Sequence, residues 1–292
     1  MGFKCGIVGL PNVGKSTIFN ALTAAGAQAE NFPFCTIEPN TGVVPVPDER
    51  LEKLAQIYNS KEVIPTKLTF VDVAGLIKGA SKGEGLGNQF LGHIRNVDAI
   101  AHVVRCFQDE NVVHIHGEIN PISDIEIIET ELVLADLELT EKQIAKYAKL
   151  AKSGDKKVKE ILANLERLKE LLSKGVWLAK AVCELELDNL GWFFPTLLTV
   201  KPLILVANVS EESLNKENDP VLLKVREYAE SRSIPLVELC GELEAQLSQL
   251  ELEEKKSFLQ ELNIKESGLE KLIKTGYSAL NLITFFTAGP KE

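Results

Sequence analysis

The chain has 292 residues, of which 45% are hydrophobic and 25% charged, and its formal net charge is −10. This balance is that of a soluble globular protein large enough for two domains, and no apolar stretch approaches the roughly 18 residues that a membrane-spanning helix needs. The acidic charge disfavours a general nucleic-acid coat, so neither a membrane nor sequence-specific DNA is expected as a partner. Five scattered cysteines without C-x-x-C spacing indicate reduced thiols of a cytoplasmic protein.

The first predicted strand, Cys5–Val8, leads directly into Gly9–Ser16, which reads G-x-x-x-x-G-K-S. In such a phosphate loop the glycines let the backbone curl, so that main-chain N–H groups and the N-terminus of a helix opening at Ser16 hold a polyphosphate. Lys15 would reach the outer phosphates and assist catalysis, and Ser16 would ligate Mg²⁺. The alternative is a chance match on a glycine-rich turn. The expected nucleotide-binding residues of this loop are Asn12, Val13, Gly14, Lys15, Ser16 and Thr17.

The next strands are expected at Gly42–Val46 and Lys67–Asp72, and the second of them ends in a D-x-x-G motif, Asp72 to Gly75. Asp72 would hold Mg²⁺ through water, and the Gly75 N–H would bond the γ-phosphate. Thr36 is the candidate for the remaining magnesium ligand, against the alternative of a plain turn threonine. The glycine-rich stretch that follows the motif favours a loop that changes shape with the bound nucleotide.

After a predicted strand at Ala99–Cys106, strand signals nearly vanish between residues 121 and 198. Apolar residues instead recur every three to four positions in two runs, with a turn at Ser153–Asp155 between them. This spacing predicts two long helices folded back on each other as an antiparallel hairpin. The tip of the hairpin is basic, which fits either an RNA phosphate surface or a solvated helical tip. Its lysines are Lys142, Lys146, Lys149, Lys152, Lys156, Lys157 and Lys159.

Strand signals resume at Pro202–Val206 and Ile234–Leu239, and candidate base-binding residues follow both strands. Asn208 to Glu211 reads N-V-S-E, where guanine-specific switches carry N-K-x-D. The two replacements disturb a guanine clamp, whereas Asn208 could pair bidentately with N6 and N7 of adenine, so ATP is expected over GTP. Main-chain N–H groups after the last strand would back the base. The expected base-site residues are Asn208, Val209, Glu211, Cys240, Gly241 and Glu242.

These elements predict an α/β protein whose nucleotide-binding domain, residues 1–120 and 199–277, has a mainly parallel sheet with covering helices. The helical hairpin, residues 121–198, interrupts that domain. The stretch from Glu244 to Lys274 is helical and charged and closes the nucleotide domain. The strand-like run Leu280–Phe286 follows, which suggests that residues 278–292 begin a further domain that this chain lacks.

Several segments together resemble the YchF-type, Obg-related P-loop NTPases: GLPNVGKST, FPFCTIEPN, DVAGLIKGASKGEGLGNQFL, the NVSE motif and the closing FFTAGPKE. The resemblance spans essentially the whole chain, and the NxxE substitution separates this branch from ordinary GTPases. It implies a Ras-like P-loop NTPase domain with an inserted helical hairpin, and ATP used over or alongside GTP. It also implies association with ribosomes, ribosomal RNA or translation factors. Members continue into a small β-rich TGS domain, whose opening would be the Leu280–Glu292 run.

The group that activates the attacking water is not fixed by these motifs. Ras-like enzymes orient the water with a glutamine just after D-x-x-G, but this chain has Leu76 there. The resemblance places it among NTPases with a hydrophobic residue at that position, so another group must serve. His114 is the candidate, with His116 and His93 in reserve, and a surface histidine without a role is the alternative. Asn12 could also ligate a K⁺ ion that bridges the phosphates.

The leading interpretation is a Mg²⁺-dependent ATPase, with GTP as a secondary substrate, that works as a ribosome-associated conformational switch. One alternative is a nucleotide-binding scaffold with negligible turnover, and another is a GTPase that prefers GTP. A P-loop small-molecule kinase is disfavoured, because the inserted hairpin shows no acceptor pocket and the NVSE motif fits a Ras-like base site.

Overall fold

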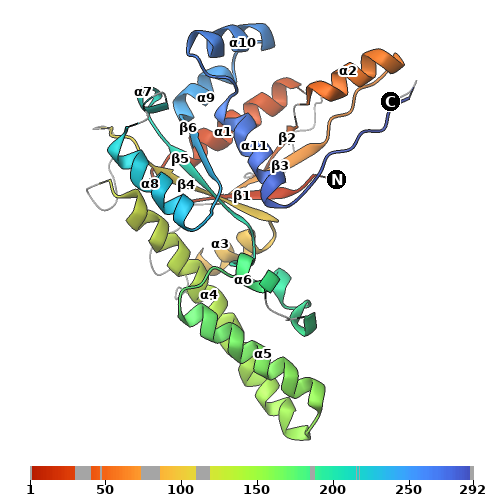
Figure 1. Ribbon diagram of the computed structural model, residues 1–292, viewed down its shortest axis with the longest axis vertical. Helices are drawn as coiled ribbons and strands as arrows, with labels where there is room; N and C mark the ends of the chain where they lie inside the picture. Colours follow the sequence, from red (N-terminus) through yellow and green to blue (C-terminus); the bar gives the residue numbers. More distant parts are fainter. Residues whose placement is uncertain are drawn as a thin grey trace.

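The computed structural model describes residues 2–29, 41–46, 48–73, 86–109, 119–184, 188–214, 216 and 218–289. Within these ranges six strands form one sheet in the order β2-β3-β1-β4-β5-β6, in which β2 is antiparallel to β3 and the other pairs are parallel (Figure 1). Each strand lies within two residues of its predicted position, so the predicted α/β fold is confirmed. The strands are β1 (Lys4–Val8), β2 (Thr41–Pro45), β3 (Lys67–Asp72), β4 (Ala99–Arg105), β5 (Leu203–Asn208) and β6 (Leu236–Leu239).

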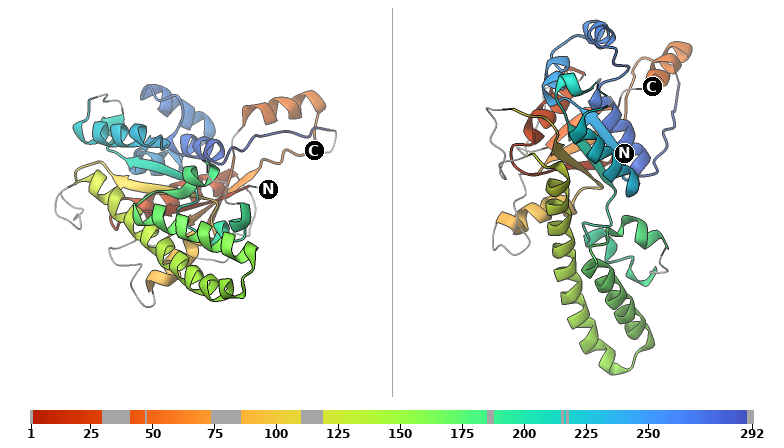
Figure 2. Two further views of the ribbon diagram at one scale, coloured as in Figure 1. Left: turned by 60° about the horizontal axis from the view of Figure 1, so that its bottom comes forward. Right: turned by 60° about the vertical axis from the view of Figure 1, so that its left-hand side comes forward.

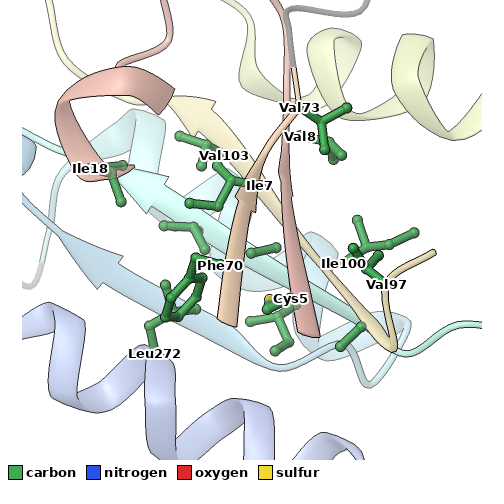
Figure 3. Packing of buried hydrophobic residues seen from close by; sticks show 14 of the residues in the cluster. Cys5, Ile7, Val8, Ile18, Phe70, Val73, Val97, Ile100, Val103 and Leu272 are labelled. Carbon is green, nitrogen blue, oxygen red and sulfur yellow. The ribbon is translucent and has the colours of Figure 1, made fainter. Parts of the chain in front are cut away.

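The central strands are continuous apolar runs because helices cover both faces of the sheet. Every residue of β4 and β5 is buried. In Figure 3 the side chains of β1 alternate, with Ile7 on the side of Ile18 from α1 and Val8 on the opposite side. Phe70 of β3 packs in the same core against Leu272 of α11. This two-sided core fixes the carboxyl ends of β1, β3, β4 and β5 at one edge, where the phosphate loop begins.

Helices α1, α9 and α11 cover one face of the sheet, and α3, α4 and α8 cover the other. In the described parts of the chain, each helix is either too short or too polar to cross a lipid bilayer. The helices outside the hairpin are α1 (Lys15–Ala29), α2 (Glu49–Tyr58), α3 (Leu86–Arg95), α7 (Glu211–Leu214), α8 (Pro220–Ser231), α9 (Gly241–Leu247), α10 (Leu252–Glu261) and α11 (Gly268–Ala279).

Two long helices, α4 (Pro121–Leu150) and α5 (Lys156–Ser173), run away from the sheet as an antiparallel hairpin (Figure 2, right). Its turn consists of η2 (Ala151–Ser153) and Gly154, whose φ of 86° lies in the left-handed region that glycine adopts at least cost. Asp155 then caps α5 by accepting a hydrogen bond from the Lys157 N–H at 2.8 Å. The chain returns to β5 through α6 (Leu178–Glu184), η3 (Asp188–Leu190) and η4 (Phe194–Thr196).

The hairpin is anchored at its root by the fully buried carboxylate of Asp136 on α4. It accepts hydrogen bonds from the Leu198 N–H at 2.9 Å and from the N–H and hydroxyl of Thr199 at 2.8 Å. Burial raises the pKa of Asp136, and the hydrogen bonds from Thr199 and Leu198 oppose that rise. Because three donors converge on one side chain, the segment that leads into β5 is tied firmly to α4.

The end of α3 contacts the same return segment. The Arg95 Nε donates to the Thr196 carbonyl oxygen at 3.2 Å, and the Lys201 Nζ donates to the Val97 carbonyl oxygen at 2.5 Å. Trp177 donates its indole N–H to the Lys201 carbonyl oxygen at 3.0 Å. The root of the hairpin therefore shares hydrogen bonds with α3, the first described element after the D-x-x-G aspartate.

The tail after α11 runs along α2 rather than joining a sheet (Figure 1). The prediction of a strand-like run at Leu280–Phe286 is wrong for this structure, because residues 282–289 form no regular secondary structure. Side chains of the α2 region hold the tail instead: Arg50 donates to the Thr284 hydroxyl at 2.8 Å and lies 5.0 Å from the centre of the Phe286 ring. These contacts leave Ile283 and Phe285 largely exposed, at 87% and 82%.

Candidate nucleotide-binding site

The loop between β1 and α1 has the backbone conformation that its glycines predict. Gly9 has a φ of 152° and Gly14 a φ of 94°, while Asn12 between them has a φ of 63°. A Cβ on Gly9 would lie 2.4 Å from the Val103 carbonyl oxygen, so the loop needs glycine there to pack against β4. The loop thus curls tightly over the ends of β1 and β4 and delivers the chain to the N-terminus of α1.

Lys15, the first residue of α1, is folded back into this loop. Only 7% of its surface is exposed, and its Nζ donates to the Leu10 carbonyl oxygen at 2.7 Å. Burial lowers the pKa of Lys15 to about 8, although the negative charge of Asp72 opposes that shift. A triphosphate oxygen would be a stronger acceptor for this ammonium group than a carbonyl, because both partners would then be charged.

Asp72 ends β3 beside Ile7 of β1, which brings its carboxylate to the phosphate loop. Its Oδ1 is buried and has no hydrogen-bond partner in the part of the chain that the structure describes. Burial raises the pKa of Asp72, while the charge of Lys15 acts in the opposite direction. An unpaired carboxylate oxygen next to a phosphate loop suits a divalent cation.

Ser16 is the second residue of the loop region that could hold magnesium. Ser16 is exposed on the first turn of α1, directly after the loop. Within the described ranges no three acidic, histidine or cysteine side chains cluster as a metal site. Mg²⁺ is usually held by one or two protein groups together with substrate phosphates, so Ser16 and Asp72 are the residues here that would hold it.

Asn208, at the end of β5, joins two loops. Its side-chain amide donates to the Val13 carbonyl oxygen at 3.0 Å and its Oδ1 accepts from the Gly241 N–H at 3.0 Å. The residue is only 4% exposed, and a Cβ on Gly14 would lie 2.2 Å from its amide nitrogen. The predicted pairing with adenine would have to use the one amide hydrogen and the one lone pair that these two bonds leave. The geometry gives Asn208 a positioning role between the phosphate loop and the β6–α9 loop.

The other predicted base-site residues lie around this junction. Val209 is buried, so its side chain belongs to the core rather than to a base pocket. Glu211 is exposed at the start of α7, and Glu242 is exposed in the first turn of α9. Cys240 precedes α9 as its N-cap residue. The two exposed carboxylates are therefore available to a ligand, whereas the side chain of Val209 is not.

Several predicted residues fall outside the described residues. Thr36, Gly75, Leu76, His114 and His116 belong to this group, so their roles stay predictions. His93, the reserve candidate for water activation, is exposed on α3.

Two buried polar residues near the site were not expected from the sequence. His102 of β4 is 1% exposed, and neither ring nitrogen has a hydrogen-bond partner among the described residues. Burial, together with the charge of Lys15, lowers its pKa to about 3, so the imidazole is neutral. Glu244 of α9 accepts from the Gly268 N–H at 2.6 Å and so links the first turn of α9 to the start of α11. No local motif marks either residue; Glu244 acts through a contact between segments 24 residues apart in the chain.

A phosphate loop between a buried strand and a helix, with a carboxylate at the end of the neighbouring strand, defines a P-loop NTPase. Residues 4–142 match the family described as 50S ribosome-binding GTPase. The chain belongs to the YchF family of P-loop NTPases. It is 55% identical over 293 residues to the ribosome-binding ATPase YchF of Haemophilus ducreyi and 50% identical to that of Bacillus subtilis, in each case covering all of this chain and 80% of the relative.

A solved structure agrees with this assignment. The structure described as the Schizosaccharomyces pombe YchF GTPase superposes with a TM-score of 0.81 at 38% identity, covering 99% of this chain and 79% of the other. The sheet order and the site geometry above are therefore those of a member of this family.

Proposed function

We propose that this chain is a Mg²⁺-dependent ATPase that acts as a nucleotide-driven switch on the ribosome in the cytoplasm. The observation that carries the proposal is that a buried lysine, Lys15, lies within electrostatic reach of Asp72, whose buried Oδ1 has no hydrogen-bond partner among the described residues. A magnesium-bound triphosphate would satisfy both groups at once. The names of the relatives, ribosome-binding ATPases, support the choice of ATP and of the ribosome.

Each residue of the loop would have a defined task in that reaction. The Lys15 ammonium would leave the Leu10 carbonyl and bind the outer phosphates. Ser16 and Asp72 would hold Mg²⁺, with Thr36 as the predicted third ligand, and the Gly75 N–H would bond the γ-phosphate. When bound, the metal supplies neutralisation of the charge that develops on the phosphoryl oxygens.

The preference for ATP over GTP is supported by the N-V-S-E motif. Val209 is buried, so the place of the guanine-clamp lysine is taken by an apolar core side chain. Glu211 is exposed at the start of α7. Titration with fluorescent ATP and GTP analogues tests the preference, and tighter binding of the guanine analogue would reverse it. Val209→Lys combined with Glu211→Asp should shift the preference towards GTP.

Turnover itself separates an ATPase from a nucleotide-binding scaffold. Single-turnover hydrolysis should release phosphate from ATP, and a Lys15→Ala variant should lose that activity. Phosphate release no faster than in the Lys15→Ala control would favour the scaffold, and faster turnover of GTP than of ATP would favour a GTPase.

His114 would activate the attacking water, and Asn12 would hold a K⁺ ion that supplies positive charge to the phosphates. A His114→Ala variant should bind ATP as tightly as the parent but hydrolyse it more slowly. Replacing K⁺ by Na⁺ in the buffer should slow hydrolysis if the ion takes part. An unchanged rate in either experiment would remove the corresponding group from the mechanism.

The switch would reach the ribosome through the helical hairpin. The root of the hairpin shares the Arg95–Thr196 and Lys201–Val97 hydrogen bonds with the end of α3, so movement of α3 would reorient the hairpin. Thermodynamic linkage is reciprocal. If bound nucleotide changes the affinity of this protein for ribosomes by some factor, bound ribosomes must change its affinity for nucleotide by the same factor. A Lys201→Met variant should weaken this mutual effect while the free protein still hydrolyses ATP at the parental rate, and an undiminished mutual effect would refute the route.

The lysine-rich tip is the surface proposed for ribosomal RNA. All seven predicted lysines are exposed, on a chain whose net charge is −10. Replacing Lys149, Lys152 and Lys156 by glutamine should reduce cosedimentation with ribosomes and flatten its dependence on salt. Unchanged cosedimentation would move the contact to another surface.

A further inference from the structure

The helical hairpin carries an aromatic pair close to its basic tip, with Trp192 exposed and Tyr147 half-buried. The rings of Tyr147, near the end of α4, and Trp192, between η3 and η4, are stacked with centroids 5.8 Å apart and planes inclined by 28°. The next residue, Phe193, is only 1% exposed in the hydrophobic core of the hairpin, which anchors this loop. Trp192 nevertheless keeps 47% of its surface in solvent. Trp192 is thus held in place by Tyr147 and Phe193 while much of its ring remains accessible to solvent.

The charge around this pair is strongly positive. The Nζ of Lys146 lies 5.9 Å from the centre of the Tyr147 ring. Residues 142–159 contain seven lysines and one acidic residue, Asp155. The carboxylate of Asp155 is itself engaged as the N-cap of α5, where it accepts from the Lys157 N–H. Glu138 pairs with Lys142 at 2.6 Å, and Glu141 pairs with Lys169 at 2.7 Å. An anionic partner would therefore meet the remaining lysines of this row next to the aromatic pair.

Lysines and an accessible aromatic ring recognise different parts of a nucleic acid. Ammonium groups bind phosphates regardless of sequence, whereas an aromatic ring binds a base only when that base is unpaired and free to stack. Sequence-specific RNA recognition uses such loops and bulges, because the major groove of an RNA duplex is too deep and narrow to be read. A protein partner fits less well, because lysine is depleted in protein interfaces.

We propose that Trp192, backed by Tyr147, is a stacking site for an unpaired base of a structured RNA whose flanking phosphates lie on the hairpin lysines. The inference rests on the proposed ribosome-binding function and specifies the partner: a loop or bulge, rather than a continuous duplex.

The two tryptophans of the chain allow a direct optical test. Trp177 is partly buried at the root of the hairpin, where its indole N–H bonds to Lys201. A Trp177→Phe variant of the full chain leaves Trp192 as the reporter, and Trp192→Phe leaves Trp177 as the matched control. Each is titrated, without nucleotide, with a short RNA stem closed by an unpaired loop and with a blunt RNA duplex of the same length.

The stem-loop RNA should quench Trp192 in the first variant, and neither RNA should quench Trp177 in the second. Trp192→Ala should weaken binding of the stem-loop about tenfold, which corresponds to about 1.4 kcal/mol, while duplex binding should change little. Trp192→Phe should retain most of the affinity, because a smaller flat ring still stacks. Far-ultraviolet circular dichroism and thermal melting establish that the hairpin of each variant remains folded.

The contrary results separate this inference from the function on which it rests. Absence of Trp192 quenching, or equal losses for both RNAs in Trp192→Ala, overturns the stacking site. If the lysine-to-glutamine tip variant still loses RNA binding in that case, the RNA-binding function stands without the stacking site. If neither RNA binds the unmodified chain, both the stacking site and the proposed RNA contact of the hairpin fail.

Discussion

Replacing Asn208 by alanine tests whether this residue reads the base or holds the site together. The side chain makes two buried hydrogen bonds of 3.0 Å, one to the Val13 carbonyl oxygen and one from the Gly241 N–H. Leaving a buried polar group without its partner costs about 1–3 kcal/mol, so the loss of both bonds should lower the free energy of unfolding by about 2–4 kcal/mol. For a chain of this size that corresponds to a fall in Tm of about 3–7 °C.

The assay is urea denaturation of the nucleotide-free protein, followed by thermal melting with and without ATP. The exposed Asn20 on α1 provides the matched control, because Asn20→Ala removes the same side chain from a solvent-facing position. A positioning role predicts that Asn208→Ala is destabilised even without nucleotide. If the nucleotide-free variant is as stable as the parent and only ATP affinity is lost, Asn208 is a base reader and the positioning argument is wrong.

Three further outcomes follow from the same geometry. Because burial lowers the pKa of Lys15 to about 8, triphosphate binding above that pH should take up a proton, and the affinity should fall by up to about tenfold per pH unit. Calorimetry in buffers of different ionisation enthalpy measures the proton uptake, and the absence of proton uptake in the parent chain would contradict the pKa argument. Gly14→Ala should abolish nucleotide binding, because its Cβ would lie 2.2 Å from the Asn208 amide nitrogen. Gly154→Ala has a similar φ but no atom within 4 Å of the new Cβ, so it should cost only about 1–2 kcal/mol of stability. Equal effects of the two substitutions would refute this steric reasoning. Asp136→Ala should lower the free energy of unfolding by about 3 kcal/mol or more, because three buried donors lose their acceptor, and an unchanged urea midpoint would show that water replaces it.

The local part of this protein was predictable from its sequence. The six strands are apolar runs that end in turn residues, and the hairpin helices repeat apolar residues at the helical period. The phosphate loop needs particular residues at fixed spacing within one short segment, so Gly9 to Ser16 could be recognised without knowledge of the fold. The tail shows the limit of this approach, because the apolar run Leu280–Phe286 resembles a strand but contacts α2.

The sequence alone therefore determined the class of the protein, the position of the phosphate loop and the existence of the inserted hairpin. Only the tertiary structure decided what the polar side chains do. Asn208 bonds to a residue 195 positions away, and Asp136 bonds to residues 62 and 63 positions away. The physical reason is that a motif fixes local backbone geometry, whereas the partner of a buried hydrogen-bonding group is set by the packing of segments far apart in the chain.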